Sequence, residues 1–598
     1  MDKKLVSKSQ IKRAFNVRGA FGNAVASATM SVAGLNRLNR LYSHVSEYQG
    51  IDFADHLLEQ LNVKCDIAPE EFENLPKEGP FIIVSNHPFG GLDGIIMLHL
   101  FGRLRPDLKI LTNFILSHIP NLKEFFFPVN PFTDNKGLKS SLKGIRMATE
   151  HLKDGGVLGL FPAGEVSSNA NKERVVKDIE WQLSIIKLIK KAGVPVVPIY
   201  FDGGNSKYFH FLGRINKYLR TLRLPGELSN KKDKTVSIRI GRPVTVLEIE
   251  EFVTLKDLGN HLWNRTYALE ANVRGEENDA VGSIEKEKIA SPVDKDILIK
   301  EIESRGEDLL FEVKDYSCYL FNAQNIPNLI KELGIRREEA FRSIGEGSNK
   351  EIDTDEYDPY YKHLVLWNKK DNAVIGAYRL GFGDEILSKY GLEGFYSNTL
   401  FRYRPEFKTY LKRAIELGRS FVSNEYQKDP LALMLLIKGL MYTVIKNPQV
   451  RFLIGPVSIS ASYPIFYRSL MIHYLKLRHS RSAIAKWVNP KFRFVPDFYR
   501  VDEDSLLKGK LDSVEKFDRF MFRLSNNRFR LPTLLKKYIK INSRIIAYNI
   551  DPDFNNCVDG LIMLDVYEVP KQEIDSLSKE MADKTAVYKR FGITEEEI

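Results

Sequence analysis

The chain has 598 residues, of which 43% are hydrophobic and 28% are charged, and its formal net charge is +11. This length exceeds one ordinary hydrophobic core, so we expect two domains or three. The three cysteines are far apart and show no metal-ligand spacing, which argues against a disulfide framework and a zinc site. The positive charge favours anionic lipid or an acidic protein over nucleic acid as a partner, because the sequence contains no zinc-finger or RNP motif.

Residues 1–50 combine positive charge with apolar side chains. They contain eight Lys or Arg residues and only two acidic residues, Asp2 and Glu47. A basic amphipathic helix of this kind either lies in the headgroup region of an anionic bilayer or packs on its own domain with a solvated outer face. No apolar run reaches the roughly 18 residues of a transmembrane helix, and no signal-peptide core is present. We therefore expect a cytoplasmic protein that is peripheral to the inner face of the cell membrane.

Residues 51–274 show the alternation of an α/β domain. Residues 51–80 are predicted to be helical and then extended, and residues 247–273 are predicted to be helical. The predicted strands are 81–84, 109–112, 157–161, 194–200 and 235–240, with helices near 138–153 and 176–192. This order indicates a largely parallel sheet, in a domain that we place at residues 1–274.

A polar, charged stretch without aromatic residues, Gly275–Ser291, predicts a linker, which we place at residues 275–295. A second domain, of the α+β class, is predicted for residues 296–598. Its predicted elements are a helix near 326–340, strands at 364–367, 374–380 and 451–457, and a long apolar helix at 431–446.

The segment from Ser85 to Asp93, with the sequence SNHPFGGLD, follows the predicted strand 81–84. It places His87 and Asp93 on either side of a Gly-Gly turn. A histidine can take a proton from a hydroxyl group at neutral pH, and a nearby carboxylate can hold its ring in the required tautomer. With an acceptor alcohol and an activated acyl group, this pair predicts acyl transfer without a metal ion or a protein nucleophile.

Two later segments add to this site. The sequence FPAGEVS at residues 161–167 follows a predicted strand and predicts a turn that binds an oxyanion or a headgroup. The sequence VPVVPI at residues 194–199 predicts a strand with prolines near its ends, which is typical of the wall of an apolar slot.

These blocks, in this order, resemble the glycerolipid acyltransferase family over roughly residues 75–245, and the turn after His87 is similar to that of its hemolysin-like subgroup. The resemblance implies that His87 is the general base for the acceptor hydroxyl and that Asp93 orients it. It also implies a set of substrate-binding residues, namely Asn86, Gly90, Gly91, Phe161, Pro162, Gly164 and Glu165.

The sequence departs from this family in two places. Five residues rather than four separate His87 from Asp93, and the Gly90-Gly91 pair can absorb the additional residue because glycine tolerates unusual backbone conformations. The family's second block carries an Arg for the substrate phosphate, whereas its equivalent here, residues 127–132, contains none. This difference indicates an acceptor without a phosphate group.

A second set of charged residues follows the linker. It consists of Arg342, Asp353, Asp355, Asp358, Arg379, Glu416 and Arg419. On a helix or a regular turn Glu416 and Arg419 would share a face and pair, whereas on a strand they would not. The set forms either a substrate site or a structural network of salt bridges.

This series is similar to that of the acyl-homoserine-lactone synthases, which have an N-acetyltransferase-like fold, and it resembles more closely the ornithine-lipid type N-acyltransferases over roughly residues 296–565. The resemblance implies transfer of a 3-hydroxyacyl chain from acyl carrier protein to the amine of an amino acid. Glu416 would accept the amine proton. The substrate would be bound by Arg342, Asp355, Asp358, Arg379 and Arg419. The basic net charge suits an acidic carrier protein, and acyl-CoA stays open as a donor.

The two halves together resemble the bifunctional amino-acid lipid synthases of the ornithine or glycine type. This resemblance implies N-acylation of ornithine or glycine by the C-terminal domain and O-acylation of the 3-hydroxyl by the N-terminal domain, with no bound cofactor or metal. Three alternatives stay open. They are a lysophospholipid (1-acylglycerol-3-phosphate) acyltransferase with a non-catalytic second domain, a membrane scaffold without catalysis, and a synthase of a diffusible acyl-amino acid.

Overall fold

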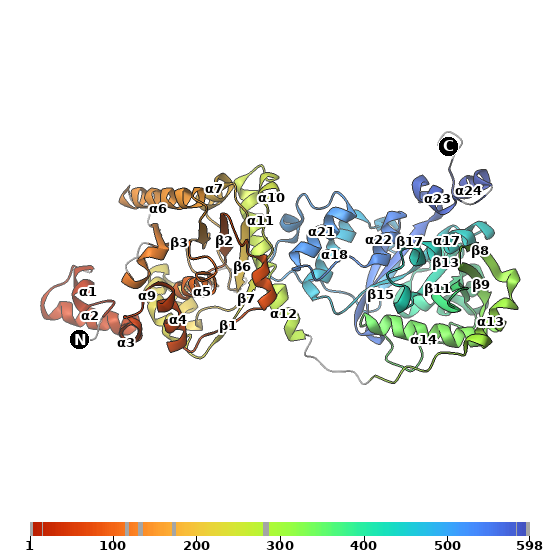
Figure 1. Cartoon of the computed structure of the whole chain (residues 1–598), viewed down its shortest axis with the longest axis horizontal. Helices are drawn as coiled ribbons and strands as arrows, with labels where there is room; N and C mark the ends of the chain where they lie inside the picture. The colour runs from red at the N-terminus through yellow and green to blue at the C-terminus, as the bar shows by residue number, and fades with distance from the viewer. Residues whose placement is uncertain are drawn as a thin grey trace. The chain divides into compact units, whose positions relative to one another are not determined.

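The computed structural model describes residues 4–14, 16–113, 119–129, 135–169, 175–278, 286–579, 581 and 583–593 (Figure 1). The chain forms two compact units. The N-terminal unit comprises Met1–Glu276, Phe498–Lys510 and Arg519–Phe529, and the C-terminal unit comprises Glu277–Asp497, Leu511–Asp518 and Arg530–Ile598. Each unit combines a central sheet with helices, which confirms the predicted fold class.

The N-terminal unit is built on a seven-stranded sheet with the strand order β1-β7-β6-β2-β5-β3-β4. The strands are Lys64–Asp66 (β1), Phe81–Ser85 (β2), Leu108–Asn113 (β3), Phe126–Val129 (β4), Val157–Leu160 (β5), Val196–Phe201 (β6) and Thr235–Ile240 (β7). All neighbours are parallel except β6 and β7, so the prediction of a largely parallel sheet is confirmed. The end of the central strand β2 leads directly into the His87 segment.

Apolar clusters cover both faces of β2. Phe81 and Ile83 belong to a cluster with side chains of α4 (Gly50–Gln60) and α5 (Gly91–Phe101). Ile82 and Val84 belong to a second cluster with side chains of α7 (Leu183–Ala192) and α11 (Leu255–Tyr267). Successive side chains of a strand point to opposite faces, so the apolar run of β2 from Phe81 to Val84 follows from its burial on both sides. The remaining helices of this part are α1 (Lys8–Ala14), α2 (Gly19–Val32), α3 (Leu35–Val45), α6 (Asn135–Lys153), α8 (Lys207–Ile215), α9 (Lys217–Ser229), α10 (Val246–Glu250) and α12 (Glu270–Asn278).

The helix predicted at residues 176–192 begins only at Leu183. The residues before it are tied to the turn after β5, because Lys177 and Ser168 form a β-bridge and exchange backbone hydrogen bonds of 3.1 and 3.2 Å. Residues 175–182 are therefore held against this turn and do not form part of the helix.

Two segments from the C-terminal part of the sequence pack in the N-terminal unit. Arg500 forms an ion pair with Glu270 and donates to the Tyr200 hydroxyl at 3.0 Å. Asn526 donates to Glu71 Oε1 at 3.1 Å. These contacts explain why residues 498–510 and 519–529 belong to this unit.

The C-terminal unit is built on an eight-stranded sheet with the order β16-β17-β14-β13-β11-β10-β9-β8. The strands are Leu309–Val313 (β8), Tyr316–Asn322 (β9), Lys362–Asn368 (β10), Ala373–Phe382 (β11), Ala414–Val422 (β13), Phe452–Ile459 (β14), Arg544–Asp551 (β16) and Cys557–Asp565 (β17). Strands β13 and β14 form the parallel pair of this sheet, and they pair only over Ala414–Glu416 and Phe452–Ile454. Both strands continue well past that point, so they diverge there.

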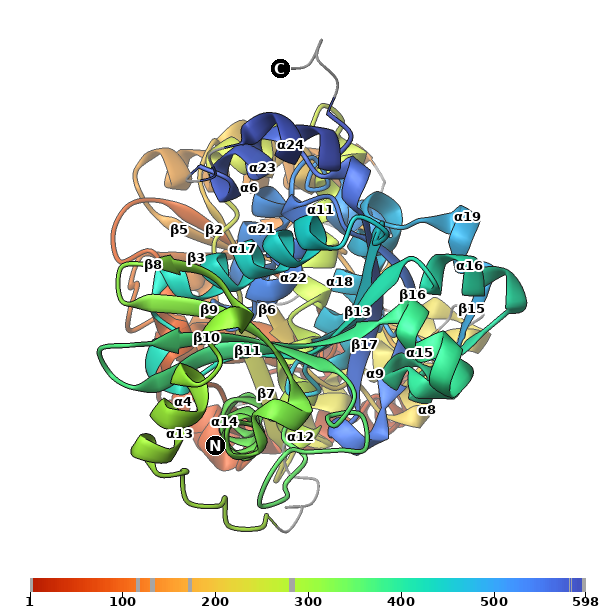
Figure 2. The same ribbon diagram turned by 90° about the vertical axis from the view of Figure 1, so that its right-hand side faces the viewer.

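Two long helices lie on opposite faces of this sheet (Figure 2). On one face, α14 (Pro327–Ser343) packs on a cluster that contains Val365. On the other, α17 (Pro430–Lys446) approaches Leu364. Further helices are α13 (Lys295–Glu303), α18 (Ile465–Arg478), α22 (Thr533–Lys540), α23 (Lys571–Leu577) and α24 (Lys584–Arg590). Within the described ranges, no helix combines the length and apolar character needed to cross a membrane.

Candidate functional site

His87 and Asp93 lie face to face after β2. The His87 Nδ1 and Asp93 Oδ2 atoms are 2.8 Å apart, and Asp93 is fully buried whereas His87 is partly exposed. Asp93 Oδ2 also accepts hydrogen bonds from the backbone N–H groups of Phe89 and Gly90, both at 3.0 Å. One carboxylate oxygen therefore closes the turn and holds the imidazole, which leaves Nε2 as the nitrogen for proton exchange.

The additional residue between His87 and Asp93 is accommodated by Gly90. Its φ of 84° lies in the left-handed region that favours glycine. A Cβ at this position would lie 3.1 Å from Leu224 and 3.3 Å from Val166, so space also restricts it. Gly91 begins α5, and Asp93 caps the N-terminus of that helix.

The predicted turn at residues 161–167 lies beside His87. The Phe161 ring is tilted by 30° to the imidazole at a centroid distance of 4.2 Å. Gln182 N donates to Pro162 O at 3.0 Å. Gly164 has a φ of 71°, and a Cβ there would collide with the Gln182 side chain. Gln182 therefore holds this turn in place, by its backbone hydrogen bond and by the close packing of its side chain on Gly164.

Asp178 ties this turn to His87, and sequence reasoning missed it. Its Oδ1 accepts from the Ser167 hydroxyl at 2.5 Å and from the His87 N–H at 3.2 Å, and its Oδ2 accepts from the Trp181 indole at 3.1 Å. Burial raises the pKa of Asp178, against the opposing effect of these donors. The sequence offered no signal for it, because its segment was predicted to be helical.

Two predicted substrate contacts are engaged by the protein. The Asn86 amide donates to Phe201 O at 2.9 Å and accepts from Phe201 N at 2.8 Å, so it fastens the end of β2 to β6. Glu165 accepts from Arg220 of α9 at 3.0 Å, a partner that the sequence did not indicate. The structure brings all predicted residues of this half together around the ends of β2 and β5.

In the C-terminal unit, Arg and Asp side chains alternate in one buried network. Arg337 of α14 donates to Asp358 at 2.7 Å. Arg379 of β11 is paired with Asp355 and lies 3.4 Å from Asp358. Although burial opposes ionisation, Arg337 and Arg379 hold the pKa of Asp358 below its usual range.

Arg419 continues this network from a bulge in β13. Its φ of 46° coincides with a register shift between β11 and β13. The guanidinium lies 3.2 Å from Asp353 and 3.1 Å from Asp355. It also lies over the rings of Tyr396, at 4.8 Å, and Phe554, at 4.5 Å. Burial disfavours the cation, yet these acidic neighbours raise the pKa of Arg419.

Glu416 does not face Arg419, as expected for residues three apart on a strand. Its carboxylate accepts from the Tyr361 hydroxyl, from Tyr396 N at 3.0 Å and from Ser397 N at 2.8 Å. Burial raises the pKa of Glu416, and the donors from Ser397 and Tyr361 oppose this effect.

Arg342 lies outside the network. It pairs with Glu338 at 2.6 Å and donates to the backbone oxygens of Glu287 and Lys350, both at 2.7 Å. Arg337, one and a half turns earlier on α14, takes the place in the network that was predicted for Arg342. Only the tertiary arrangement separates the two arginines, since both lie in the same basic helical segment.

Three further carboxylates of this unit interact electrostatically: Asp559 with Glu346 and Asp551, and both Asp551 and Asp559 with Arg419. Glu346 accepts from the Ser458 hydroxyl at 2.6 Å, and burial raises its pKa to about 7. Burial also raises the pKa values of Asp551 and Asp559, whose charges repel each other. In the described part of the chain, no group of three or more His, Cys, Asp or Glu is arranged to hold a metal ion.

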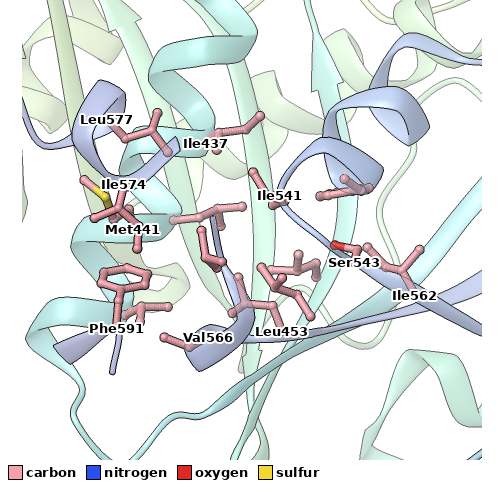
Figure 3. A pocket seen from close by; sticks show the side chains of 16 residues that line it. Ile437, Met441, Leu453, Ile541, Ser543, Ile562, Val566, Ile574, Leu577 and Phe591 are labelled. Atoms are coloured by element: carbon pink, nitrogen blue, oxygen red, sulfur yellow. The ribbon is translucent and has the colours of Figure 1, made fainter. Parts of the chain in front are cut away.

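An apolar cavity lies on the α17 side of the sheet (Figure 3). Its walls come from β13, β14, α17, β17 and the C-terminal helices, with Leu417, Met441, Leu453, Ile562, Ile574, Leu577 and Phe591 among the lining side chains. Tyr538 also lines it and donates to the hydroxyl of Tyr378, the residue before Arg379, at 3.0 Å. Leu417 and Glu416 are adjacent, so cavity and charged network occupy opposite faces of the sheet where β13 and β14 diverge.

Comparisons with known proteins agree with this two-part arrangement. Residues 38–275 match the sequence profile described as Acyltransferase, and residues 336–437 match that described as Acetyltransferase (GNAT) domain. A Glycine N(alpha)-acyltransferase of Phocaeicola vulgatus is 36% identical over 304 residues, which cover 47% of this chain and 90% of that protein. The protein of the same name from Bacteroides thetaiotaomicron is 28% identical over 297 residues, with 47% and 87% covered. A Lyso-glycine lipid O-acyltransferase of Bacteroides thetaiotaomicron is 30% identical over 227 residues, with 37% and 80% covered.

Proposed function

The chain belongs to the bifunctional amino-acid lipid synthases, with an acyltransferase half and a GNAT half in one polypeptide, and we propose that it builds a two-chain glycine lipid. The C-terminal unit joins a 3-hydroxyacyl chain to the amine of glycine. The N-terminal unit then esterifies the 3-hydroxyl with a second acyl chain. The observation that carries this proposal is the presence of two separate sites in one chain, a His-Asp pair and a charged network backed by an apolar cavity.

Glycine is proposed over ornithine because the relatives of both kinds are named for glycine. A glycine lipid carries no phosphate. The sequence at residues 127–132 agrees, since it lacks the Arg that would bind one; residues 130–132 lie outside the described part.

For O-acylation, His87 Nε2 accepts the proton of the 3-hydroxyl as its oxygen attacks the thioester carbonyl. The tetrahedral intermediate collapses, the C–S bond breaks, and the leaving thiolate takes the proton from His87. Asp93 holds the proton on Nδ1 and stabilises the imidazolium that forms in between. Phe161 packs on the ring and limits its rotation. The turn at residues 161–167, with Gly164 and Glu165, lines the acceptor side, while Asn86 and Asp178 act as positioning residues.

For N-acylation, the neutral amine of glycine attacks the thioester carbonyl and gives up a proton to a base of the protein; the C–S bond then breaks, and the leaving thiolate takes a proton back from that base. Arg337 and Arg379 are fully buried and order the acidic side chains, whereas Asp355 and Arg419 reach the edge of the network and are proposed to meet the substrate. Glu416 is enclosed by three donors, so the proton reaches it through the Tyr361 hydroxyl, which gives its own proton to Glu416 as it takes that of the amine.

The acyl chain of the donor is proposed to pass between the diverging strands β13 and β14 and so to reach the apolar cavity on the α17 side of the sheet. This route takes the thioester to the charged face and leaves the hydrocarbon against Leu417, Leu453 and Met441. The donor is proposed to be an acyl carrier protein, because the net charge of +11 favours an acidic partner.

The test is expression in a bacterial host that makes no amino-acid lipids, followed by mass spectrometry of the lipid extract. With isotope-labelled glycine in the medium, the proposal expects label in a lipid with two acyl chains. Label from ornithine alone would correct the head group. An extract in which only phospholipid acyl chains change would indicate a lysophospholipid acyltransferase instead.

A further inference from the structure

Two helical segments of the N-terminal unit, far apart in sequence, share an unusual composition. Residues 8–45 contain six Lys or Arg residues and residues 207–226 contain five, and neither segment contains Asp or Glu. The structure joins them: α3 packs beside α9 (Figure 1). Arg223 of α9 donates to Val32 O at 2.9 Å. The two segments therefore form one acid-free surface, here called the α3–α9 face.

Large apolar side chains are exposed on this face. Tyr208, Phe211 and Ile215 follow the spacing i, i+3, i+7 and so share one side of α8. Leu219 and Leu222 repeat the pattern on α9. Phe211 is 55% exposed and Ile215 is 61% exposed.

One side chain connects these apolar residues to the end of α2. The Arg223 guanidinium that bonds to Val32 O also lies 5.6 Å from the centroid of the Tyr208 ring. Val32 itself is exposed. Apolar surface that is gathered in this way and left uncovered marks a site of association.

The charged residues on this face indicate which kind of partner it binds. Lys207 and Arg214 are exposed on α8, beside the apolar stripe, and Arg37 and Arg40 are exposed on α3. A nucleic acid would meet these charges but would leave Phe211 and the neighbouring aliphatic groups in water. An anionic bilayer accepts both kinds of side chain, because apolar groups enter the acyl boundary while Lys and Arg meet the headgroups.

The α3–α9 face adjoins the His87 site. A Cβ at Gly90, in the turn between His87 and Asp93, would lie 3.1 Å from Leu224 of α9. Arg220 of the same helix forms the ion pair with Glu165 at 3.0 Å. Helix α9 thus has one side on the catalytic turn and another on the exposed stripe.

We propose that the α3–α9 face, with the α8 stripe at its centre, is the surface by which the N-terminal unit docks on an anionic lipid bilayer. Docking there brings the His87 turn, which α9 contacts, close to the membrane, where an acceptor with a fatty chain resides. This last step rests on the proposed function, whereas the docking itself rests only on the surface.

The experiment measures co-sedimentation of the full-length chain with vesicles of phosphatidylcholine, with and without phosphatidylglycerol. We expect binding to the anionic vesicles that weakens as salt is raised. The double substitution Phe211→Ser, Ile215→Ser should lower the partition coefficient at least about tenfold. The charge reversal Lys207→Glu, Arg214→Glu should have a comparable effect.

The matched control is Leu247→Ser, Val253→Ser, which removes two apolar side chains that are 78% and 90% exposed in the same unit but lie outside the face. This control should bind vesicles within about twofold of the wild type. Thermal unfolding of every variant checks that it is folded.

Absence of vesicle binding by the wild type would overturn the proposal. Equal losses in the control and in the Phe211, Ile215 variant would do the same. So would binding at wild-type strength by the Phe211, Ile215 variant or by the Lys207, Arg214 variant. No acyl donor is present in this assay, so its outcome does not depend on whether the chain transfers acyl groups.

Discussion

Replacing Asp93 by Asn separates two roles of this carboxylate, namely the contacts that its oxygen makes and the negative charge that it carries. In the structure one oxygen, Oδ2, lies 2.8 Å from His87 Nδ1 and accepts from the N–H groups of Phe89 and Gly90. An Asn side chain whose oxygen occupies that position keeps all three contacts, and so keeps the turn and the orientation of the ring. It loses the negative charge that stabilises the imidazolium.

The expected cost follows from the strength of charged and neutral hydrogen bonds. A hydrogen bond to a charged group is worth about 1.5–3 kcal/mol and a neutral one about 1 kcal/mol, so Asp93→Asn should lower kcat/KM for O-acylation by roughly 2- to 30-fold. Asp93→Ala also frees the ring and leaves two buried N–H groups without an acceptor. Its loss should reach about 10²–10⁴-fold, with a clear drop in thermal stability.

The assay is transfer of acyl groups to a purified one-chain glycine lipid, with Asp52→Asn as the control because Asp52 is an exposed residue of α4. Asn and Ala variants of equal activity would refute the reasoning, since the charge alone would then account for the whole effect. An Asn variant as active as the wild type would refute it as well.

Three further substitutions address the C-terminal unit. Glu416→Gln should lower N-acylation of glycine by at least about 100-fold, measured as labelled glycine in lipid, because the proton acceptor is lost; full activity would exclude Glu416 from that role. Burial raises the pKa of Glu346 to about 7 in the folded chain, from a usual value near 4.5. The folded state therefore holds this proton more tightly than the unfolded state, so stability falls as pH rises from 4.5 to 7, by roughly 3 kcal/mol in full. Glu346→Gln should remove that fall in urea unfolding at the two pH values, and parallel curves for variant and wild type would contradict it. Met441→Phe fills part of the apolar cavity and should lower kcat/KM for a long-chain donor about tenfold more than for a short-chain donor; equal effects on both would place the chain elsewhere.

Five strands and the His-Asp pair of the N-terminal unit were predictable because their signals are local, whereas the short strands β1 and β4 were not predicted. The apolar run before Ser85 predicts β2, and the glycines of the turn permit the longer spacing between His87 and Asp93. The rest of this site depends on contacts between distant segments. Asp178 reaches His87 across 91 positions of sequence, and no pattern around Asp178 indicates that bond.

The charged network of the C-terminal unit was also predicted only in part, because it too depends on contacts between distant segments. Arg379, Asp355 and Arg419 were predicted as a set from a series of residues, and the structure brings them together. Arg337 was missed in favour of Arg342, because both are arginines of one helix and only the packing of α14 on the sheet decides which of them turns inward.

The most direct test of the two-step account is the lipid profile of the His87→Ala variant in a host that makes no amino-acid lipids. The account predicts that the glycine lipid with one acyl chain accumulates and that the form with two chains is absent. Retention of the two-chain lipid, or loss of both forms, would contradict the division of labour between the two units.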